Sequence, residues 1–161
     1  MSTDSTDFTL LKAALDLTSS LDLKAGLQNF VDQACVLTSS PHATLSVLDT
    51  WGATTLQLEF HEPGPIPKVP KALMTAIPAS EPLLVNSPSD APDLDLPETT
   101  PPFLGVSILV HEQVYGRLYL CGKAGGYSSA DAAVLSALAP AAGIAVENAH
   151  LYAASKRTER W

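Results

Sequence analysis

Proline is distributed very unevenly in this chain. Eleven of the thirteen prolines lie within residues 62–102. Proline has no backbone donor and its φ is fixed, so helices and strands in this stretch must be short. We expect a two-turn helix over residues 71–77, a short strand over 82–86 and an irregular acidic loop over 87–102. Longer regular structure must come from the segments on either side.

Those flanking segments contain two pairs of predicted strands. Apolar residues alternate with polar ones over residues 43–48 and 54–61, which indicates an antiparallel hairpin with one buried face. Residues 103–111 and 114–122 are apolar on both faces and are separated by a turn short enough for a tight hairpin. We therefore place this second pair in the centre of one sheet.

Helical periodicity marks both ends of the chain. Residues 8–18 and 22–37 carry apolar residues at helical spacing. A last, Ala-rich helix starts near Ser128 or Ser129, where Ser128 and Asp131 resemble a capping box, and continues beyond His150. Pro140 should kink it. Helices at both ends of an antiparallel sheet predict an α+β architecture.

Composition excludes several classes of function. The net charge is −8, from 17 acidic and 9 basic residues, and such a field repels nucleic acid. No apolar run approaches the roughly 18 residues of a spanning helix, and residues 1–4 lack the features of a signal peptide. We expect a soluble cytoplasmic protein with no nucleic-acid or membrane partner. Two distant cysteines, Cys35 and Cys121, give neither a metal spacing nor a disulfide framework.

Three segments carry a resemblance to a known family. They are residues 20–38, then Phe103-Leu-Gly-Val-Ser-Ile with Val114-Tyr-Gly-Arg-Leu-Tyr-Leu, then Tyr127-Ser-Ser-Ala-Asp with Ala141-Ala-Gly-Ile-Ala-Val-Glu-Asn-Ala. They resemble GAF domains, in particular those of bacterial two-component sensor histidine kinases. The resemblance implies about six antiparallel strands, with the terminal helices on one side and a ligand pocket on the other. We assign residues 1–7 as a flexible N-terminus, 8–152 as the GAF domain and 153–161 as the start of a signalling helix or linker.

The resemblance also implies a function: a sensory, small-molecule-binding and dimerisation domain upstream of a kinase region. The ligand is unknown. Apolar residues near the expected pocket, with one histidine at its mouth, are the candidate lining, and the acidic loop is a candidate lid. Since alternate residues of a strand face opposite sides, some of these candidates must be wrong. The candidates are Leu45, Val47, Leu58, Phe60, His61, Leu73, Met74, Leu84, Val106 and Ile108.

Two sequence differences from cofactor-binding relatives argue against haem and bilin as cofactors of this protein. Haem-binding relatives place an axial His before the Phe-Leu-Gly strand, and residues 86–102 contain none. Bilin-binding relatives use a pocket cysteine, and residues 49–100 contain none. We expect a colourless protein, with His61 hydrogen-bonded or at the surface. We assign no metal site, since the acidic loop matches no cation-binding pattern.

Two alternatives to a sensory module remain open. One is a GAF-fold enzyme of the methionine sulfoxide reductase type, for which Cys121 is the only candidate thiol, although a core position fits it better. The other is a dimerisation spacer whose pocket is filled by its own side chains. We expect no catalytic residue.

The terminal helices have more apolar surface than one sheet requires. One face of each can cover the sheet, and the other then favours a partner. We predict a parallel homodimer. Its interface would include Leu11, Leu15, Ala141, Ile144 and Leu151.

Overall fold

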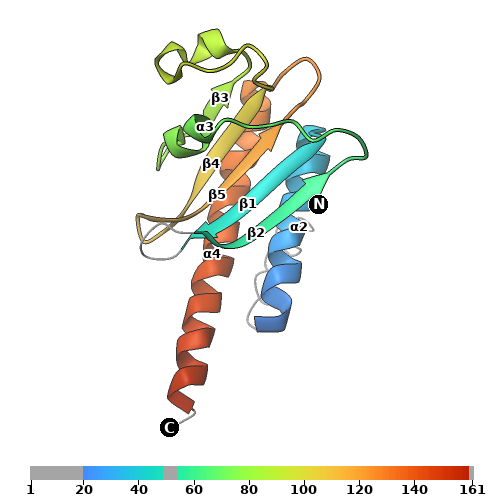
Figure 1. Cartoon of the computed structure of the whole chain (residues 1–161). Helices are drawn as coiled ribbons and strands as arrows, with labels where there is room; N and C mark the ends of the chain where they lie inside the picture. The colour runs from blue at the N-terminus through green and yellow to red at the C-terminus, as the bar shows by residue number, and fades with distance from the viewer. Residues whose placement is uncertain (1–19, 49–53, 160–161) are drawn as a thin grey trace.

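The computed structural model describes residues 20–48 and 54–159, where it contains one antiparallel sheet of five strands. The strand order is β2-β1-β5-β4-β3 (Figure 1). The two expected hairpins lie side by side through β1 and β5, so the α+β prediction is confirmed, with five strands in place of about six. The strands are β1 (His42–Leu48), β2 (Thr54–His61), β3 (Leu83–Val85), β4 (Phe103–Val110) and β5 (Gln113–Cys121).

The proline-rich middle forms only short elements, as expected. It contains the six-residue helix α3 (Lys71–Ala76), the three-residue strand β3, and 3-10 turns at Pro88–Asp90 and Pro92–Leu94. Strand β3 pairs with residues 103–105 alone. Regular pairing on this side of the sheet therefore ends after three residues, because proline cannot donate to a strand ladder.

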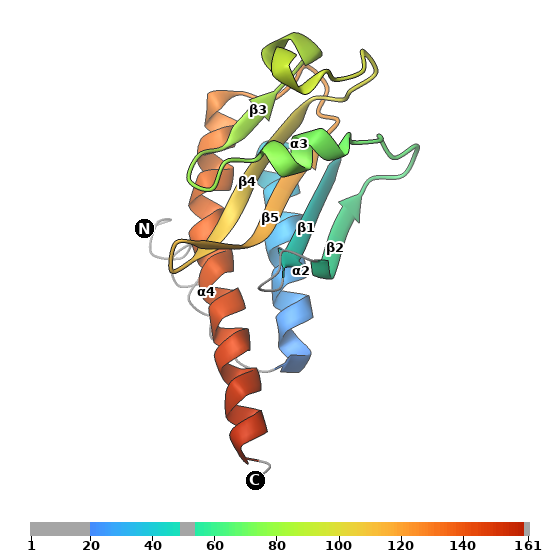
Figure 2. The same cartoon turned by 60° about the vertical axis from the view of Figure 1, so that its left-hand side comes forward.

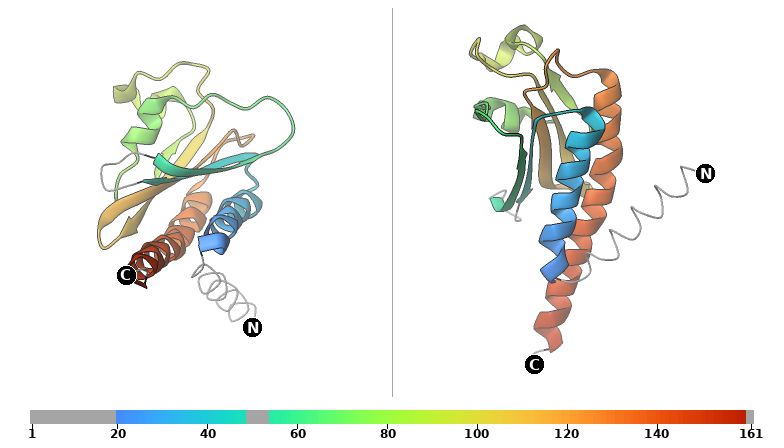
Figure 3. Two further views of the ribbon diagram at one scale, coloured as in Figure 1. Left: turned by 60° about the horizontal axis from the view of Figure 1, so that its bottom comes forward. Right: turned by 90° about the vertical axis from the view of Figure 1, so that its right-hand side faces the viewer.

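Two helices cover one side of the sheet, which we call the inner face. Helices α2 (Ser20–Thr38) and α4 (Ser129–Glu159) lie next to each other there (Figure 3). Side chains such as Leu27, Leu118 and Leu135 are fully buried between helices and sheet. Gly143 allows the close contact of α4 with β4, because a Cβ there would lie 2.5 Å from the carbonyl oxygen of Leu109.

The opposite side, which we call the outer face, carries α3 and the 3-10 turns (Figure 2). A second, smaller apolar cluster forms where α3 meets β3 and β4, from Leu73, Ile77, Val85 and Phe103. Leu94 and Leu96 of the acidic loop pack against this cluster. The loop is therefore anchored at the β3 end of the sheet and does not lie over the face as a detached lid.

Helix α4 runs without interruption through Pro140, and its C-terminal part extends past the sheet (Figure 1). The expected capping box is present, since the Ser128 amide donates to Asp131 and the Asp131 amide donates to the Ser128 hydroxyl. Contrary to the run-length argument, the segment Ser129–Asn148 is long and apolar enough to span a membrane by length and composition alone. Its burial against β4 accounts for much of that composition.

One turn and one bulge shape the central hairpin. His111 and Glu112 form the turn between β4 and β5, both with positive φ, as a two-residue hairpin turn requires. The register shifts after Ile108, next to Gly116. A Cβ at Gly116 would lie 2.8 Å from the carbonyl oxygen of Ser46, so this glycine permits the close approach that its place in the strand predicts. The predicted helix over residues 8–18 lies outside the described residues.

Candidate functional site

The strand register decides which side chains face the helices. Val106 pairs with Leu118, which pairs with Leu45, and all three belong to the inner core. Six of the proposed pocket residues lie on this face, as does Leu45, so they cannot line a pocket on the outer face. This is a correction to the predicted pocket, and its cause is that the apolar residues of each strand follow the helices. The six are Val47, Leu58, Phe60, Leu84, Val106 and Ile108.

The other three pocket candidates lie outside the inner core. Leu73 is fully buried in the apolar cluster under α3, where it fills space and leaves none for a ligand. Met74 is half-buried on the same helix. His61 is half-buried at the end of β2, on the outer face, and is hydrogen-bonded, as expected.

The outer face instead carries a set of polar side chains at alternate positions of β1, β2, β4 and β5. The sequence-based prediction named apolar residues as the pocket lining and omitted these polar ones. The period-two alternation identifies them, because each has an inner-core residue as a chain neighbour. We call this set the outer polar surface. It comprises His42, Thr44, Ser46, Gln57, Glu59, His61, Ser107, Arg117 and Tyr119.

Arg117 lies in the middle of this surface. It is in register with Ser46 on β1 and with Ser107 on β4, so one hydroxyl lies on each side of it. Its Nε is buried and has no hydrogen-bond partner, although the residue as a whole is only half-buried. Among the residues whose side chains the structure describes (24–48, 54 and 56–148), no carboxylate forms an ion pair with Arg117. Buried polar atoms of native proteins are nearly always paired, so this one requires an explanation.

Three titratable side chains form a chain of hydrogen bonds along one end of the surface. His42 Nδ1 lies 3.1 Å from His61 Nδ1, and His61 Nε2 lies 2.8 Å from Glu59 Oε2. Burial, together with the neighbouring His61, lowers the pKa of His42. The hydrogen bond from His61 lowers the pKa of Glu59. One imidazole must donate and the other accept between the two Nδ1 atoms, so the two Nδ1 atoms cannot both carry a hydrogen.

Tyr119 joins the polar surface to the apolar cluster. Its ring stacks on Phe103 with centroids 5.4 Å apart, and its hydroxyl is hydrogen-bonded to Thr44. Burial raises the pKa of Tyr119 above its usual value, so it is a neutral phenol at physiological pH. Ser107 donates a 2.9 Å hydrogen bond to the carbonyl of Pro78, which holds the end of α3 against β4.

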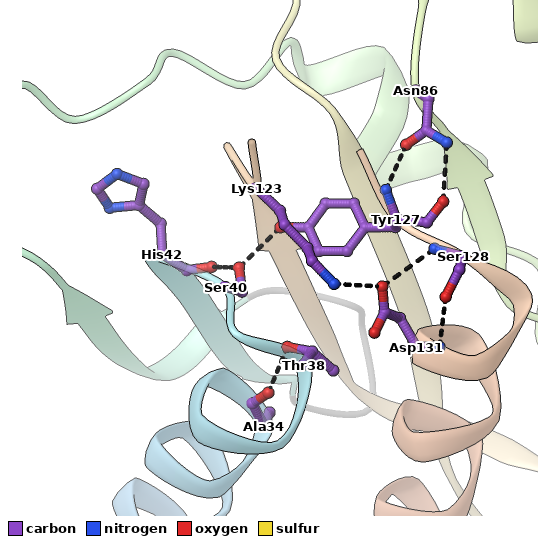
Figure 4. A network of polar contacts seen from close by, with 9 residues as sticks. All are labelled: Ala34, Thr38, Ser40, His42, Asn86, Lys123, Tyr127, Ser128 and Asp131. Carbon is purple, nitrogen blue, oxygen red and sulfur yellow. Dashed lines mark hydrogen bonds and ion pairs between the residues drawn. The ribbon is translucent and has the colours of Figure 1, made fainter. Parts of the chain in front are cut away.

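A second polar network lies where α4 begins (Figure 4). The Asn86 amide forms two hydrogen bonds with the backbone of Tyr127, at 2.9 and 2.8 Å. The Tyr127 hydroxyl lies 2.7 Å from Ser40 Oγ, and Lys123 Nζ lies 2.8 Å from Asp131. Each of these groups has a partner within the network, so we assign it a structural role in fixing α4 to the ends of the strands.

The cysteines are buried, and the described residues contain no cluster of metal ligands. Cys35 and Cys121 are free thiols in the core. Burial raises the pKa of Cys35 to about 12 and the pKa of Cys121 to about 11. Both shifts oppose thiolate formation, which a reactive cysteine needs. Where the structure describes side chains, no three His, Cys, Asp or Glu residues come together as a metal site would require.

An open groove of about 210 Å³ lies elsewhere, between β4, α4 and the segment before β3. It shares Ser107 with the outer polar surface, but its other lining residues are mainly small or apolar, among them Ala79, Leu109, Ala139 and Pro140. It follows from the shortness of β3, which leaves the second half of β4 without a neighbour on that side. We therefore centre the candidate site on Arg117 and not on this groove.

The proposed dimer residues are only partly covered by the structure. Ile144 is 52% exposed and Ala141 is half-buried on α4, while Ala142 and Ala145 on the other side of the helix are fully buried. The two apolar sides expected for this helix are thus distinct. Leu11 and Leu15 lie outside the described residues, as does the side chain of Leu151.

Known proteins share this architecture and parts of the sequence pattern. The GAF domain of the cyanobacteriochrome TePixJ is 15% identical, with a TM-score of 0.61 over 84% of this chain and 95% of its own. The GAF domain of a protein assigned as a sensor histidine kinase from Pseudomonas syringae pv. tomato is 19% identical, with a TM-score of 0.56 over 97% of each chain.

An enzyme also shares the fold. The free methionine-R-sulfoxide reductase from Neisseria meningitidis, solved with its substrate, is 15% identical, with a TM-score of 0.59 over 88% of each chain. At these identities the solved structures establish the fold alone. The family's own sequence profile, that of the GAF domain, matches residues 22–146, which is most of the chain. This chain therefore belongs to the GAF domain family, whose members are typical of signalling sensor proteins.

Proposed function

We propose that this protein is a sensory domain that binds a small molecule on the outer face of its sheet and dimerises through its helices. The observation that carries the proposal is the composition of the outer polar surface. Nine polar side chains occupy outward positions on four strands, and Arg117 among them has a buried atom without a partner. A purely structural outer face needs neither this half-buried cation nor so many hydroxyl groups.

The output side of the proposal rests on α4. This helix covers the inner face with one side, exposes Ile144 on another, and extends past the sheet (Figure 2). Two copies related by a two-fold axis would place two such helices next to each other. We infer that they pass the signal to a kinase region in a cytoplasmic two-component protein, which agrees with the similarity to the Pseudomonas syringae domain.

Two measurements test ligand binding. Native mass spectrometry of the gently purified protein should show a mass above that of the chain, and removal of the bound molecule should lower the melting temperature. The absorption spectrum should lack the bands of haem and bilin, as the missing histidine and cysteine predict. A mass equal to the bare chain, with a melting temperature unaffected by any metabolite fraction, would leave the dimerisation spacer as the better description.

Light scattering tests dimerisation. We expect a dimer at micromolar concentration, and Ile144→Glu should shift it towards monomer because the glutamate would be desolvated in the interface. Ser89→Glu, on an exposed position of the outer layer, is the matched control and should leave the mass unchanged. A monomer that persists up to millimolar concentration contradicts the proposal.

The enzyme alternative makes a different demand on the thiols. A sulfoxide reductase needs a reactive thiolate, whereas burial raises the pKa of Cys121 to about 11. We propose that the protein is not an enzyme. Free methionine-R-sulfoxide with a dithiol reductant should give no turnover, and alkylation at pH 8 should be roughly 100-fold slower in the folded than in the unfolded chain, since the thiolate fraction changes tenfold per pH unit. Turnover abolished by Cys121→Ser would support the reductase instead.

A further inference from the structure

The geometry around Arg117 points to a binding site for a carboxylate group, which names the ligand class of the proposed sensor as small organic carboxylates. This assignment rests on the proposed ligand-binding function. Its basis is the guanidinium at the centre of the outer polar surface, which has a buried Nε without an acceptor. A partly desolvated cation without a counter-charge is unfavourable, and a bound anion removes that cost.

The residues beside Arg117 fit such a group. Ser46 and Ser107 flank it at the same register, and adjacent strands are about 4.8 Å apart. Thr44 and Tyr119 form the register pair two residues further along on the same face. Ser107 already donates to the Pro78 carbonyl, and one of Thr44 and Tyr119 donates to the other. The Ser46 hydroxyl and the remaining hydroxyl of that pair can therefore donate to a carboxylate that the arginine holds.

No carboxylate of the described chain takes the place of the ligand. Glu59, two strands away, is already paired with His61 at 2.8 Å and with Gln57 at 2.7 Å. The exposed Lys68 and Lys71 stand before and at the start of α3, in the same outer layer, and form no ion pair within the described ranges.

The shape of the group favours carboxylate over phosphate. A guanidinium presents Nε–H and one Nη–H as a parallel pair, which matches the two oxygens of a planar carboxylate. Such a side-on contact uses the unpaired Nε–H, which the side chain must turn to expose because the atom is buried in this conformation. A phosphate dianion would leave an excess negative charge beside a single arginine, with no second cation in register with it.

The test uses acetate, a carboxylate small enough to enter a site built for larger organic carboxylates. The whole chain is labelled with ¹⁵N and titrated with sodium acetate at constant ionic strength. Acetamide is the neutral isostere and methylphosphonate the tetrahedral anion. We expect acetate to shift the Arg117 Nε–H signal and the amide signals of β1 and β5 around it. Acetamide should bind at least about tenfold more weakly, because hydrogen bonds to a charged group are worth more than 1.4 kcal/mol, the equivalent of a factor of ten.

The decisive variants are Arg117→Gln and Lys24→Gln. Arg117→Gln should weaken acetate binding about tenfold or more, and its amide spectrum reports directly whether it folds. Lys24→Gln removes an exposed charge from α2, in the other layer, and should have no effect. Should Arg117→Gln fail to fold, Arg117→Lys keeps the charge, loses the fork and should still weaken binding.

Three results overturn the assignment: acetate leaves the Arg117 signal unmoved, Arg117→Gln binds as wild type does, or methylphosphonate binds more tightly than acetate. In each case a neutral or phosphorylated molecule found by native mass spectrometry would leave the proposed sensory function intact. Absence of any bound molecule in both experiments would overturn both proposals.

Discussion

The two faces of the sheet are made from alternate residues of the same strands, yet they are built for different tasks. In β5, Leu118 and Leu120 are fully buried against the helices, while the alternate residues Arg117 and Tyr119 face the other way and carry polar groups. The inner face is filled by side chains of α2 and α4. The outer face is covered by α3 only near β3 and β4, through the cluster that contains Leu73.

This difference separates stability from recognition. Apolar burial supplies most of the folding free energy, so the inner face tolerates little change. The outer polar surface contributes little to the free energy of apolar burial, and residues such as Ser46 and Arg117 are therefore available for binding. Stability measurements on matched pairs of variants test whether the two faces differ in this way.

The largest effect should come from the inner face. Leu118→Ala removes a fully buried side chain from the middle of the sheet and should cost about 3 kcal/mol of the free energy of unfolding, from lost burial and a remaining cavity. Urea unfolding measures it. Ser46→Ala, on the outer face of the adjacent strand, should cost less than about 1 kcal/mol. Equal losses would show that the outer face is a second core and would contradict this difference between the faces.

The next effect concerns the contact between α4 and the inner face. Gly143→Ala places a Cβ where the Leu109 carbonyl lies at 2.5 Å, and backbone cannot move aside as a flexible side chain would. We expect a loss of about 2 kcal/mol in urea unfolding. The control, Ser136→Ala on an exposed position of α4, should be neutral or slightly stabilising because alanine favours helix. A stable Gly143→Ala would mean that α4 can slide on the sheet.

A smaller effect is expected at the start of α4, where the two faces are joined. Asp131 accepts hydrogen bonds from Lys123 and the Ser128 amide, and although burial opposes ionisation, these contacts lower the pKa of Asp131. Asp131→Asn should cost about 1 kcal/mol at neutral pH. Since the folded pKa is the lower one, this contribution is present above the unfolded pKa and is lost as pH falls below about 4.

The melting temperatures of wild type and Asp131→Asn should therefore converge under acid conditions. Asp93→Asn, on an exposed position, should show no such convergence. A difference independent of pH would indicate that the asparagine fails for steric reasons.

The smallest effect belongs to the outer polar surface. Burial and His61 lower the pKa of His42, while Glu62 raises it. Glu59 is bound to the far nitrogen of His61. The unfolded chain therefore takes up a proton before the folded one, and stability falls as pH drops through about 6.5, the ordinary histidine pKa. His42→Gln should reduce this loss in thermal unfolding between pH 7 and 5. A His42→Gln variant that loses as much stability as wild type over this pH range would contradict this origin of the effect.

Much of the fold follows from local chemistry that the sequence displays. Proline confined residues 62–102 to short elements, alternation marked the strands, and Ser128 with Asp131 marked the start of α4 to within one residue. Gly116 was expected at a bulge or close approach and has both. These features arise from effects of neighbouring residues on the backbone, so the local sequence is enough to predict them.

The candidate site did not follow in the same way. Alternation showed that β1 and β5 have two different faces, but not which of them the helices cover. The prediction placed Val106 and Ile108 in a pocket because ligand pockets are mostly apolar. The folded chain uses these residues to bury α4, and the polar residues between them are left on the outer face.

The set of elements, the family and the period of each strand could be predicted from the sequence, because these features depend on residues within a few positions of one another. The role of each face of the sheet depends on how distant segments pack, so it became clear only from the folded chain. Arg117 stands between Ser46 and Ser107, residues about seventy and ten positions away, through strand register alone. Whether its Nε finds a partner depends on every neighbouring strand and on α3, and no local pattern contains that information.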